Sequence, residues 1–214
     1  MKIGILWDLD GTLLDTLEDL ADGVNYALAQ FGYPERTLEE VRRFVGNGAK
    51  NLIGRAVPEG ADPAPVFAVF QTYYATHCQI KTRPYAGVLQ QLAKLAQYPM
   101  AVVSNKPDVA VKPLCRQYFP GVYALGERPD CPRKPAPDMV LRAMADIGVE
   151  RCIYVGDSEV DVMTANNAGV PCLSVLWGFR DREEIEAAGG QYFCVQIEEL
   201  ASTLEEMIHD LTAQ

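Results

Sequence analysis

An apolar run that ends abruptly in acids is the feature that most constrains this chain. Residues 3–7 (IGILW) have the length and composition of a buried strand, and Asp8 and Asp10 follow it one residue apart. In an open α/β sheet, ligands bind beyond the carboxyl ends of the strands, so acids at this point favour a functional site. Asp-Gly after an apolar run is also typical of a hairpin turn. The helical pattern that begins at Thr16 favours the site, because a hairpin needs a returning strand.

Composition limits the kind of partner. The chain has 214 residues, is 49% hydrophobic, and carries 19 Lys and Arg against 29 Asp and Glu, for a net charge of −10. This length fits one large domain, or a domain with a modest insertion. The negative charge argues against nucleic acid and anionic membranes as partners. An anionic substrate would therefore need locally placed cations or a metal ion.

The sequence predicts a cytoplasmic protein. We find neither the pattern of a signal peptide nor an apolar run of transmembrane length. The six cysteines lack the close spacing of zinc-ligand pairs, so we expect reduced thiols that are mostly part of the core.

Residues 16–82 predict an inserted, all-helical domain. Thr16 with Asp19, and Thr37 with Glu40, match the Ser/Thr-x-x-acid pattern of a helix start. No strand pattern occurs between residues 16 and 80. The flanking segments, 1–15 and 83–214, would form the other domain, and two chain crossings near residues 15 and 82 would suit a lid.

After residue 83, strand patterns alternate with helical ones, which predicts an α/β fold with a Rossmann-like parallel sheet covered by helices on both faces. The expected strands cover residues 100–104, 122–125, 152–155, 172–176 and 192–195. Right-handed crossovers place all strand carboxyl ends at one edge of such a sheet. The residues that follow the strands should then converge there.

Three further segments carry polar groups to this edge: Ser104-Asn105-Lys106, Lys134-Pro135 and Gly156-Asp157-Ser158. Each has a structural alternative. Ser104-Asn105 could be an ordinary connection, Lys134 a solvated loop cation, and Ser158 with Asp161 a helix cap. Clustered carboxylates repel unless a cation offsets them, and an oxygen-only cluster favours Mg²⁺.

These segments, in this order, resemble the four motifs of the haloacid dehalogenase superfamily: residues 8–13 (DLDGTL), 104–106 (SNK), 134–135 (KP) and 156–161 (GDSEVD). The helical insertion resembles the helical-cap subclass of that superfamily. Residues 45–49, 83–88 and 177–180 are similar to segments of its phosphoglycolate phosphatase group.

The resemblance implies a Mg²⁺-dependent phosphatase acting on a small phosphorylated metabolite, first of all 2-phosphoglycolate, through an aspartyl-phosphate. Asp8 would be the nucleophile and Asp10 the general acid and base. Asp8, the main-chain carbonyl of Asp10, and Asp157 would hold the metal. Pyrophosphatases and phosphosugar phosphatases or mutases share these motifs, whereas dehalogenases lack the second acid. A non-catalytic binding module on the same fold is a more distant alternative.

The resemblance also implies roles for the remaining polar residues of these motifs. Ser104, Asn105 and Lys134 would hold the phosphoryl oxygens, Asp161 would orient Lys134 or a metal-bound water, and Thr12 would shape the substrate loop. Gly46-Asn47-Gly48 would contact substrate from the helical domain, although such a segment is also a common helix break. Arg43, Lys50 and Arg180 are candidate partners for a substrate carboxylate, although any one of them is more often a solvated surface charge. We expect a monomer or a homodimer, and exposed cap aromatics could support the homodimer.

Overall fold

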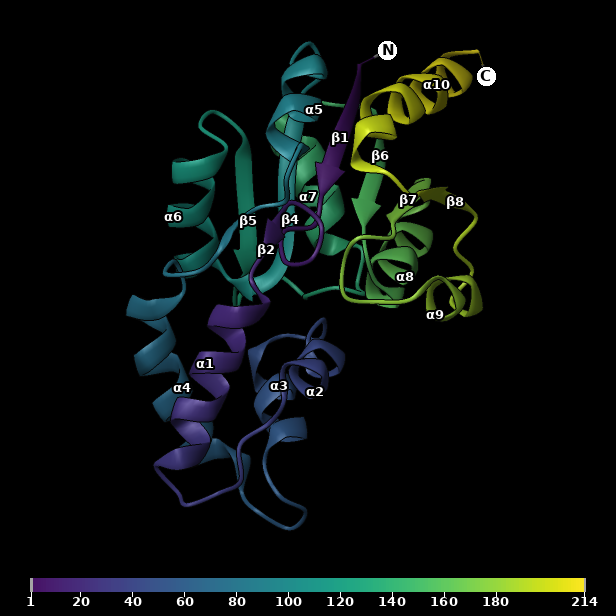
Figure 1. Ribbon diagram of the computed structural model, residues 1–214. Coiled ribbons are helices and arrows are strands. Elements are labelled where there is room, and N and C mark those ends of the chain that lie inside the picture. Colours follow the sequence, from purple (N-terminus) through teal and green to yellow (C-terminus); the bar gives the residue numbers. More distant parts are fainter. Residues whose placement is uncertain (1, 214) are drawn as a thin grey trace.

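The computed structural model describes residues 2–213. Its centre is a six-stranded sheet in the order β5-β4-β1-β6-β7-β8, and each neighbouring pair is parallel. The strands are β1 (Ile3–Trp7), β4 (Met100–Pro107), β5 (Tyr123–Glu127), β6 (Arg151–Gly156), β7 (Cys172–Val175) and β8 (Tyr192–Cys194). The predicted α/β class with a Rossmann-like parallel sheet is confirmed (Figure 1).

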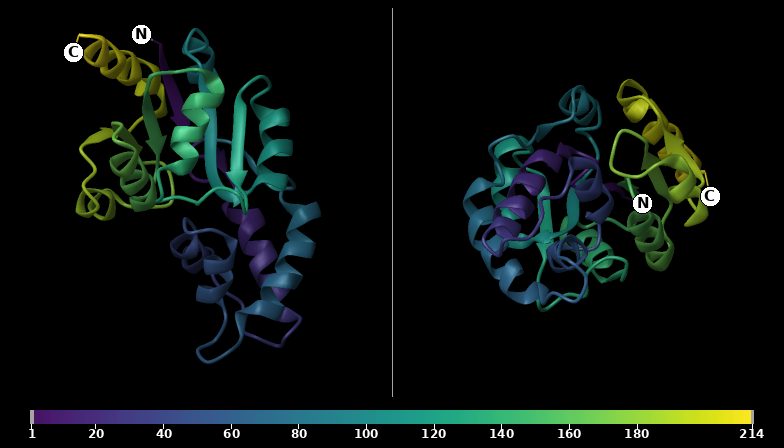
Figure 2. Two further views of the ribbon diagram at one scale, coloured as in Figure 1. Left: turned by 180° about the vertical axis from the view of Figure 1, so that it is seen from behind. Right: turned by 60° about the horizontal axis from the view of Figure 1, so that its bottom comes forward.

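Helices cover both faces of this sheet, as its apolar strands require. Along β1, Ile5 and Trp7 belong to a core cluster that includes residues of α5, α6 and α10, whereas Leu6 belongs to the cluster with α7, α8 and α9. Figure 2 shows the layers from behind and from below. The elements are α5 (Val88–Lys94), α6 (Asp108–Tyr118), α7 (Asp138–Ile147), α8 (Glu159–Ala168), α9 (Arg182–Ala187), η1 (Ile197–Glu199) and α10 (Leu200–Thr212).

Four helices form a separate block beyond the carboxyl ends of the strands (Figure 1). Most of their buried apolar residues pack in a cluster distinct from those of the sheet. The chain enters and leaves the block through β2 (Leu14–Asp15) and β3 (Arg83–Pro84), which pair antiparallel. We call α1 (Leu17–Ala29), α2 (Leu38–Phe44), α3 (Ala49–Ala56) and α4 (Pro63–His77) the helical block. The domain boundaries at residues 15 and 83 stay a prediction.

One helix start differs from expectation. Thr37 and Glu40 form the predicted capping box of α2, but the Thr16 side chain makes no capping bond to α1. The Asp19 carboxylate instead accepts the main-chain N–H groups of residues 80–82, at 2.8 to 3.1 Å. A buried carboxylate takes the donors that tertiary structure brings to it, so Asp19 joins the entrance of the block to its exit.

Strand β4 continues to Pro107, with an irregular register after Val103, so Ser104, Asn105 and Lys106 lie within its last part rather than after it. All six cysteines are buried free thiols. Between residues 2 and 213, no helix is both long enough and apolar enough to cross a membrane.

Candidate active site

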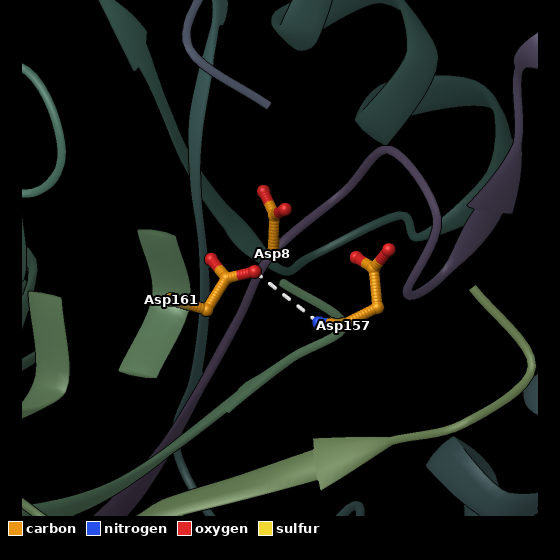
Figure 3. A group of neighbouring side chains, drawn as sticks. All are labelled: Asp8, Asp157 and Asp161. Atoms are coloured by element: carbon orange, nitrogen blue, oxygen red, sulfur yellow. Dashed lines mark hydrogen bonds between the residues drawn. The ribbon is translucent and has the colours of Figure 1, made fainter. Parts of the chain in front are cut away.

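Three carboxylates meet where β1 and β6 end. Asp8 follows β1, Asp157 lies in the β6–α8 connection and Asp161 in the first turn of α8 (Figure 3). Each has an oxygen within 4.8 Å of the others, and all three are buried. The parallel sheet explains the convergence, because it brings both strand ends to one edge.

Lys134 lies between two of these acids. Its Nζ is 2.9 Å from Asp8 Oδ1 and 2.7 Å from Asp161 Oδ1, and it donates to the Tyr154 hydroxyl at 3.0 Å. Burial by itself would lower the pKa of Lys134, but attraction to Asp161 and Asp8 outweighs burial and raises this pKa well above its usual value. Lys134 is therefore a charged part of the site and not a solvated loop cation.

Asp161 serves both predicted purposes at once. Its Oδ1 holds Lys134, while its Oδ2 accepts the main-chain N–H groups of Asp157 and Ser158, at 3.2 and 3.1 Å, and the Ser158 hydroxyl at 2.6 Å. The capping box of α8 therefore also anchors the lysine. With donors on both oxygens, Asp161 is better suited to orienting Lys134 than to binding a ligand.

Asp157 is fixed from two other loops. Its Oδ1 accepts the Thr12 hydroxyl at 2.9 Å, and its Oδ2 accepts the Phe179 N–H at 2.8 Å. Gly11, at φ +89°, and Gly178 leave the space for this carboxylate, since a Cβ at either position would collide with it. Burial, followed by repulsion from Asp161, raises the pKa of Asp157 to about 7.

The donor set fits a divalent cation. Four acids, Asp8, Asp10, Asp157 and Asp161, face two buried lysines, Lys106 and Lys134, which leaves an excess of two negative charges. Burial and the repulsion of Asp161 raise the pKa of Asp8 even though Lys134 opposes them. Mg²⁺ prefers oxygen ligands, and binding it would offset the excess negative charge of this cluster.

Asp10 points to a different partner. Its Oδ1 accepts from Lys106 Nζ at 2.8 Å, and the same ammonium donates to the hydroxyl of Tyr74, on α4, at 2.8 Å. The carboxylates of Asp10 and Asp8 therefore bind different lysines. Its carboxylate is connected instead to the helical block.

A pocket between the sheet edge and the helical block contains most of the predicted site residues. Its lining includes Asp8, Asp10, Gly46, Gly48, Ser104, Asn105, Lys134 and Asp157. Thr12 and Asn47 are not part of that lining. The Thr12 hydroxyl reaches Asp157, and Asn47 contributes a main-chain carbonyl to Asn51, so a direct substrate contact of either side chain stays a prediction.

Asn105 supports the main chain around Lys134, and its expected contact with the phosphoryl group stays a prediction. Its Oδ1 accepts the Lys134 N–H at 2.9 Å, and its Nδ2 donates to the Lys134 carbonyl at 3.0 Å and to the Gly46 carbonyl at 3.3 Å. The amide thus fixes the backbone that carries Lys134. Ser104 Oγ accepts the Lys106 N–H at 3.1 Å and lies in the pocket lining.

Each of the three candidate partners of a substrate carboxylate has a neighbour within the protein, and a contact with substrate stays a prediction for all three. Arg180 pairs with Glu159 at 2.9 Å and donates to the carbonyls of Arg42, Arg43 and Val45. The side chain of Arg43 is 75% exposed and pairs with Glu39, and the Lys50 ammonium lies 5.9 Å from the centre of the Phe67 ring. Among them, only Arg180 lines the pocket.

Sequence reasoning missed two site residues. Lys106 follows Asn105 at the end of an expected strand, a position that offered a signal, but no role was assigned to it. Tyr74 belongs to an aromatic repeat on α4 that also builds the core of the helical block, so its pattern does not distinguish packing from a polar role.

This geometry agrees with what comparison with known proteins finds. Residues 5–175 match the family model described as haloacid dehalogenase-like hydrolase. A phosphoglycolate phosphatase from Pseudomonas putida is 35% identical over 198 residues, covering 86% of this chain and 72% of that protein. One from Vibrio parahaemolyticus is 32% identical over 214 residues, covering 92% and 93%.

A solved structure resembles this one over nearly its whole length. The crystal structure of a candidate phosphoglycolate phosphatase from Lactobacillus delbrueckii subsp. bulgaricus superposes with a TM-score of 0.88 and 36% identity. The match covers 94% of this chain and 97% of the other. The likeness therefore includes the helical block as well as the sheet.

Proposed function

The chain belongs to the haloacid dehalogenase-like hydrolase family, and we propose that it hydrolyses 2-phosphoglycolate to glycolate and phosphate with Asp8 as nucleophile. It is a phosphoric monoester hydrolase, in line with its relatives. The choice of 2-phosphoglycolate rests on the names of those relatives. The cytoplasmic location and the monomer or homodimer stay predictions.

The position of Asp8 carries the proposal. Lys134 binds its Oδ1 and so fixes the carboxylate at the floor of the pocket. For Oδ2, the described residues supply no hydrogen-bond donor and no cation. A carboxylate in the pocket lining that is held at one oxygen and has no protein donor at the other is suited to attack phosphorus.

The reaction would proceed in two displacements. In the first, an Asp8 oxygen bonds to phosphorus, the bond from phosphorus to the substrate oxygen breaks, and Asp10 gives its proton to the departing alkoxide. In the second, Asp10 takes a proton from water, the resulting hydroxide attacks phosphorus, and the bond to Asp8 breaks. Phosphate leaves and both carboxylates return to their starting states.

Asp8, Asp157 and the main-chain carbonyl of Asp10 would hold Mg²⁺. When bound, the ion would neutralise the acidic edge and the negative charge of the phosphoryl group. Lys134 would stabilise charge on the transferring oxygens together with Ser104. Asp161 would orient Lys134, Asn105 would fix the Lys134 backbone, and Thr12 would orient Asp157. The helical block would act as a lid that excludes bulk water.

The first test is a comparison of substrates. Phosphate release would be measured from 2-phosphoglycolate, pyrophosphate and a set of sugar phosphates, with Mg²⁺ and with a chelator. We expect the highest kcat/KM for 2-phosphoglycolate and loss of turnover with the chelator. A clear preference for pyrophosphate or for a sugar phosphate would reassign the substrate, while leaving the site chemistry in place.

The second test concerns the two acids. Asp8→Asn should abolish turnover because an amide oxygen is a poor nucleophile, and Asp10→Asn should lower kcat by about 10²–10⁴-fold, the usual contribution of general acid–base catalysis. Asp210→Asn, at an exposed position on α10, is the matched control. Full phosphatase activity in Asp8→Asn, with a folded protein, would refute the assignment.

A further inference from the structure

Lys106 is a buried cation whose two partners come from different parts of the molecule. It lies at the end of β4, and its side chain is 3% exposed. One partner is Asp10, in the loop after β1, and the other is Tyr74, in the helical block, each at 2.8 Å. The ammonium also lies 4.8 Å from the centre of the Tyr74 ring.

The geometry divides the two oxygens of Asp10. Lys106 binds Oδ1, and no other described side chain or main-chain N–H donates to either oxygen. Oδ2 is therefore the oxygen that can carry and transfer a proton. The direction in which Oδ2 points depends on how Lys106 holds Oδ1. A long lysine side chain has many rotamers, so a single contact with Asp10 would hold that carboxylate loosely.

Tyr74 removes this freedom. Its ring is stacked on Phe70 with centroids 5.0 Å apart, and both rings are buried in the core of the helical block. The phenol oxygen accepts one N–H of Lys106, which leaves the ammonium with a defined orientation toward Asp10. The contact exists only when α4 lies against the end of β4.

We propose that Lys106 and Tyr74 are positioning residues that fix Asp10 for proton transfer when the helical block is docked on the sheet edge. The proposal rests on the proposed role of Asp10 as general acid and base. It assigns to the helical block a part in catalysis beyond the exclusion of water, because docking completes the support of the acid.

The test exploits the dependence of acid catalysis on the leaving group. A basic leaving group needs a proton to depart, whereas a weakly basic one does not. Phenyl phosphate and 4-nitrophenyl phosphate are close in shape but differ greatly in the basicity of the group that departs. Their kcat/KM values report the steps up to that departure and so isolate the first displacement.

The variant is Tyr74→Phe, which keeps the ring and its stacking and removes only the hydroxyl. We expect its kcat/KM to fall about tenfold more for phenyl phosphate than for 4-nitrophenyl phosphate, part of the full effect of a general acid. Lys106→Met should show the same selectivity with a larger loss. Tyr73→Phe is the matched control, because this neighbour on α4 stacks on Tyr26 and His77 and does not reach Lys106.

Asp10→Asn provides the benchmark. If it shows the selective loss and Tyr74→Phe does not, or if Tyr74→Phe affects both esters equally, the positioning role is wrong while the function of Asp10 stands. If Asp10→Asn itself loses activity equally toward both esters, the proposed function fails at its acid. Selective losses in Asp10→Asn, Tyr74→Phe and Lys106→Met, with Tyr73→Phe unchanged, would support the proposal.

Discussion

Arg180 offers the most direct test of how the helical block is held on the sheet edge. Its side chain is buried and makes four hydrogen bonds, to the Glu159 carboxylate and to the carbonyls of Arg42, Arg43 and Val45. Those carbonyls lie at the C-terminal end of α2, where helical carbonyls lack partners within the helix. A cation there also interacts favourably with the helix dipole.

The expected cost of Arg180→Met follows from these contacts. The substitution keeps most of the apolar stem and removes every donor. A hydrogen bond to a charged group contributes about 1.5–3 kcal/mol, but water can replace part of each bond at the end of a helix. We therefore expect a fall of about 3–5 kcal/mol in the free energy of unfolding, a large part of the 5–15 kcal/mol typical of a domain.

The loss of these hydrogen bonds can lower global stability, which urea unfolding measures, or release the helical block, which hydrogen exchange measures. If the block stays docked, the free energy of unfolding falls; if it separates while still folded, the amides of α2 and α3 exchange faster. Arg43→Met is the matched control, because this arginine is 75% exposed and its pair with Glu39 should contribute below about 0.5 kcal/mol. A change under about 1 kcal/mol in Arg180→Met, with exchange in α2 and α3 as in the wild type, would refute this reasoning.

Two further predictions concern Asp157. Its pKa of about 7 in the folded protein lies above its ordinary value of 3.8, so the folded state binds the proton more tightly than the unfolded state. In the presence of chelator, the free energy of unfolding should therefore fall as pH rises from about 4 to 7, and Mg²⁺ should restore it above pH 7. Unfolding measurements at several pH values, with chelator and with Mg²⁺, would test this. Thr12→Val removes the hydroxyl that Asp157 accepts and should weaken Mg²⁺ binding about tenfold or more, measured by calorimetric titration, and unchanged affinity would argue against an orienting role.

The sheet and the acids at its edge could be predicted because their causes are local. Apolar runs of strand length alternate with helical patterns, and parallel strands bring whatever follows them to one edge. Asp8 and Asp157 are therefore placed by topology alone, without any knowledge of side-chain contacts. Lys134 also reaches the site, and the structure adds the distances at which Asp161 and Asp8 bind it there.

What could not be predicted depends on contacts between distant segments. Asp19 matches the helix-start pattern but binds N–H groups of residues 80–82, which no local pattern reveals. Arg180 is a candidate partner of a substrate carboxylate, and its hydrogen bonds to carbonyls of the helical block could not be read from the sequence. Tyr74 has the sequence spacing of a core aromatic residue, and its ring does pack in the core of the helical block. Its hydroxyl has a polar role only because Lys106 donates to it.

The short ladder between β2 and β3 brings the two ends of the helical block together. Leu14 and Asp15 lie beside Pro84 and Arg83, so everything between them leaves and re-enters the sheet domain at nearly one point. The entropy of closing a loop grows only slowly with its length, so the sheet would tolerate inserts of very different size at this point. The β2–β3 junction is therefore a point at which the helical block could be exchanged without moving the strands of the sheet. A helical block from a relative with another substrate could be grafted there. Asp8 and Asp157 would stay in place, whereas Asp10 would keep its support only if the graft carried a hydroxyl at the place of Tyr74.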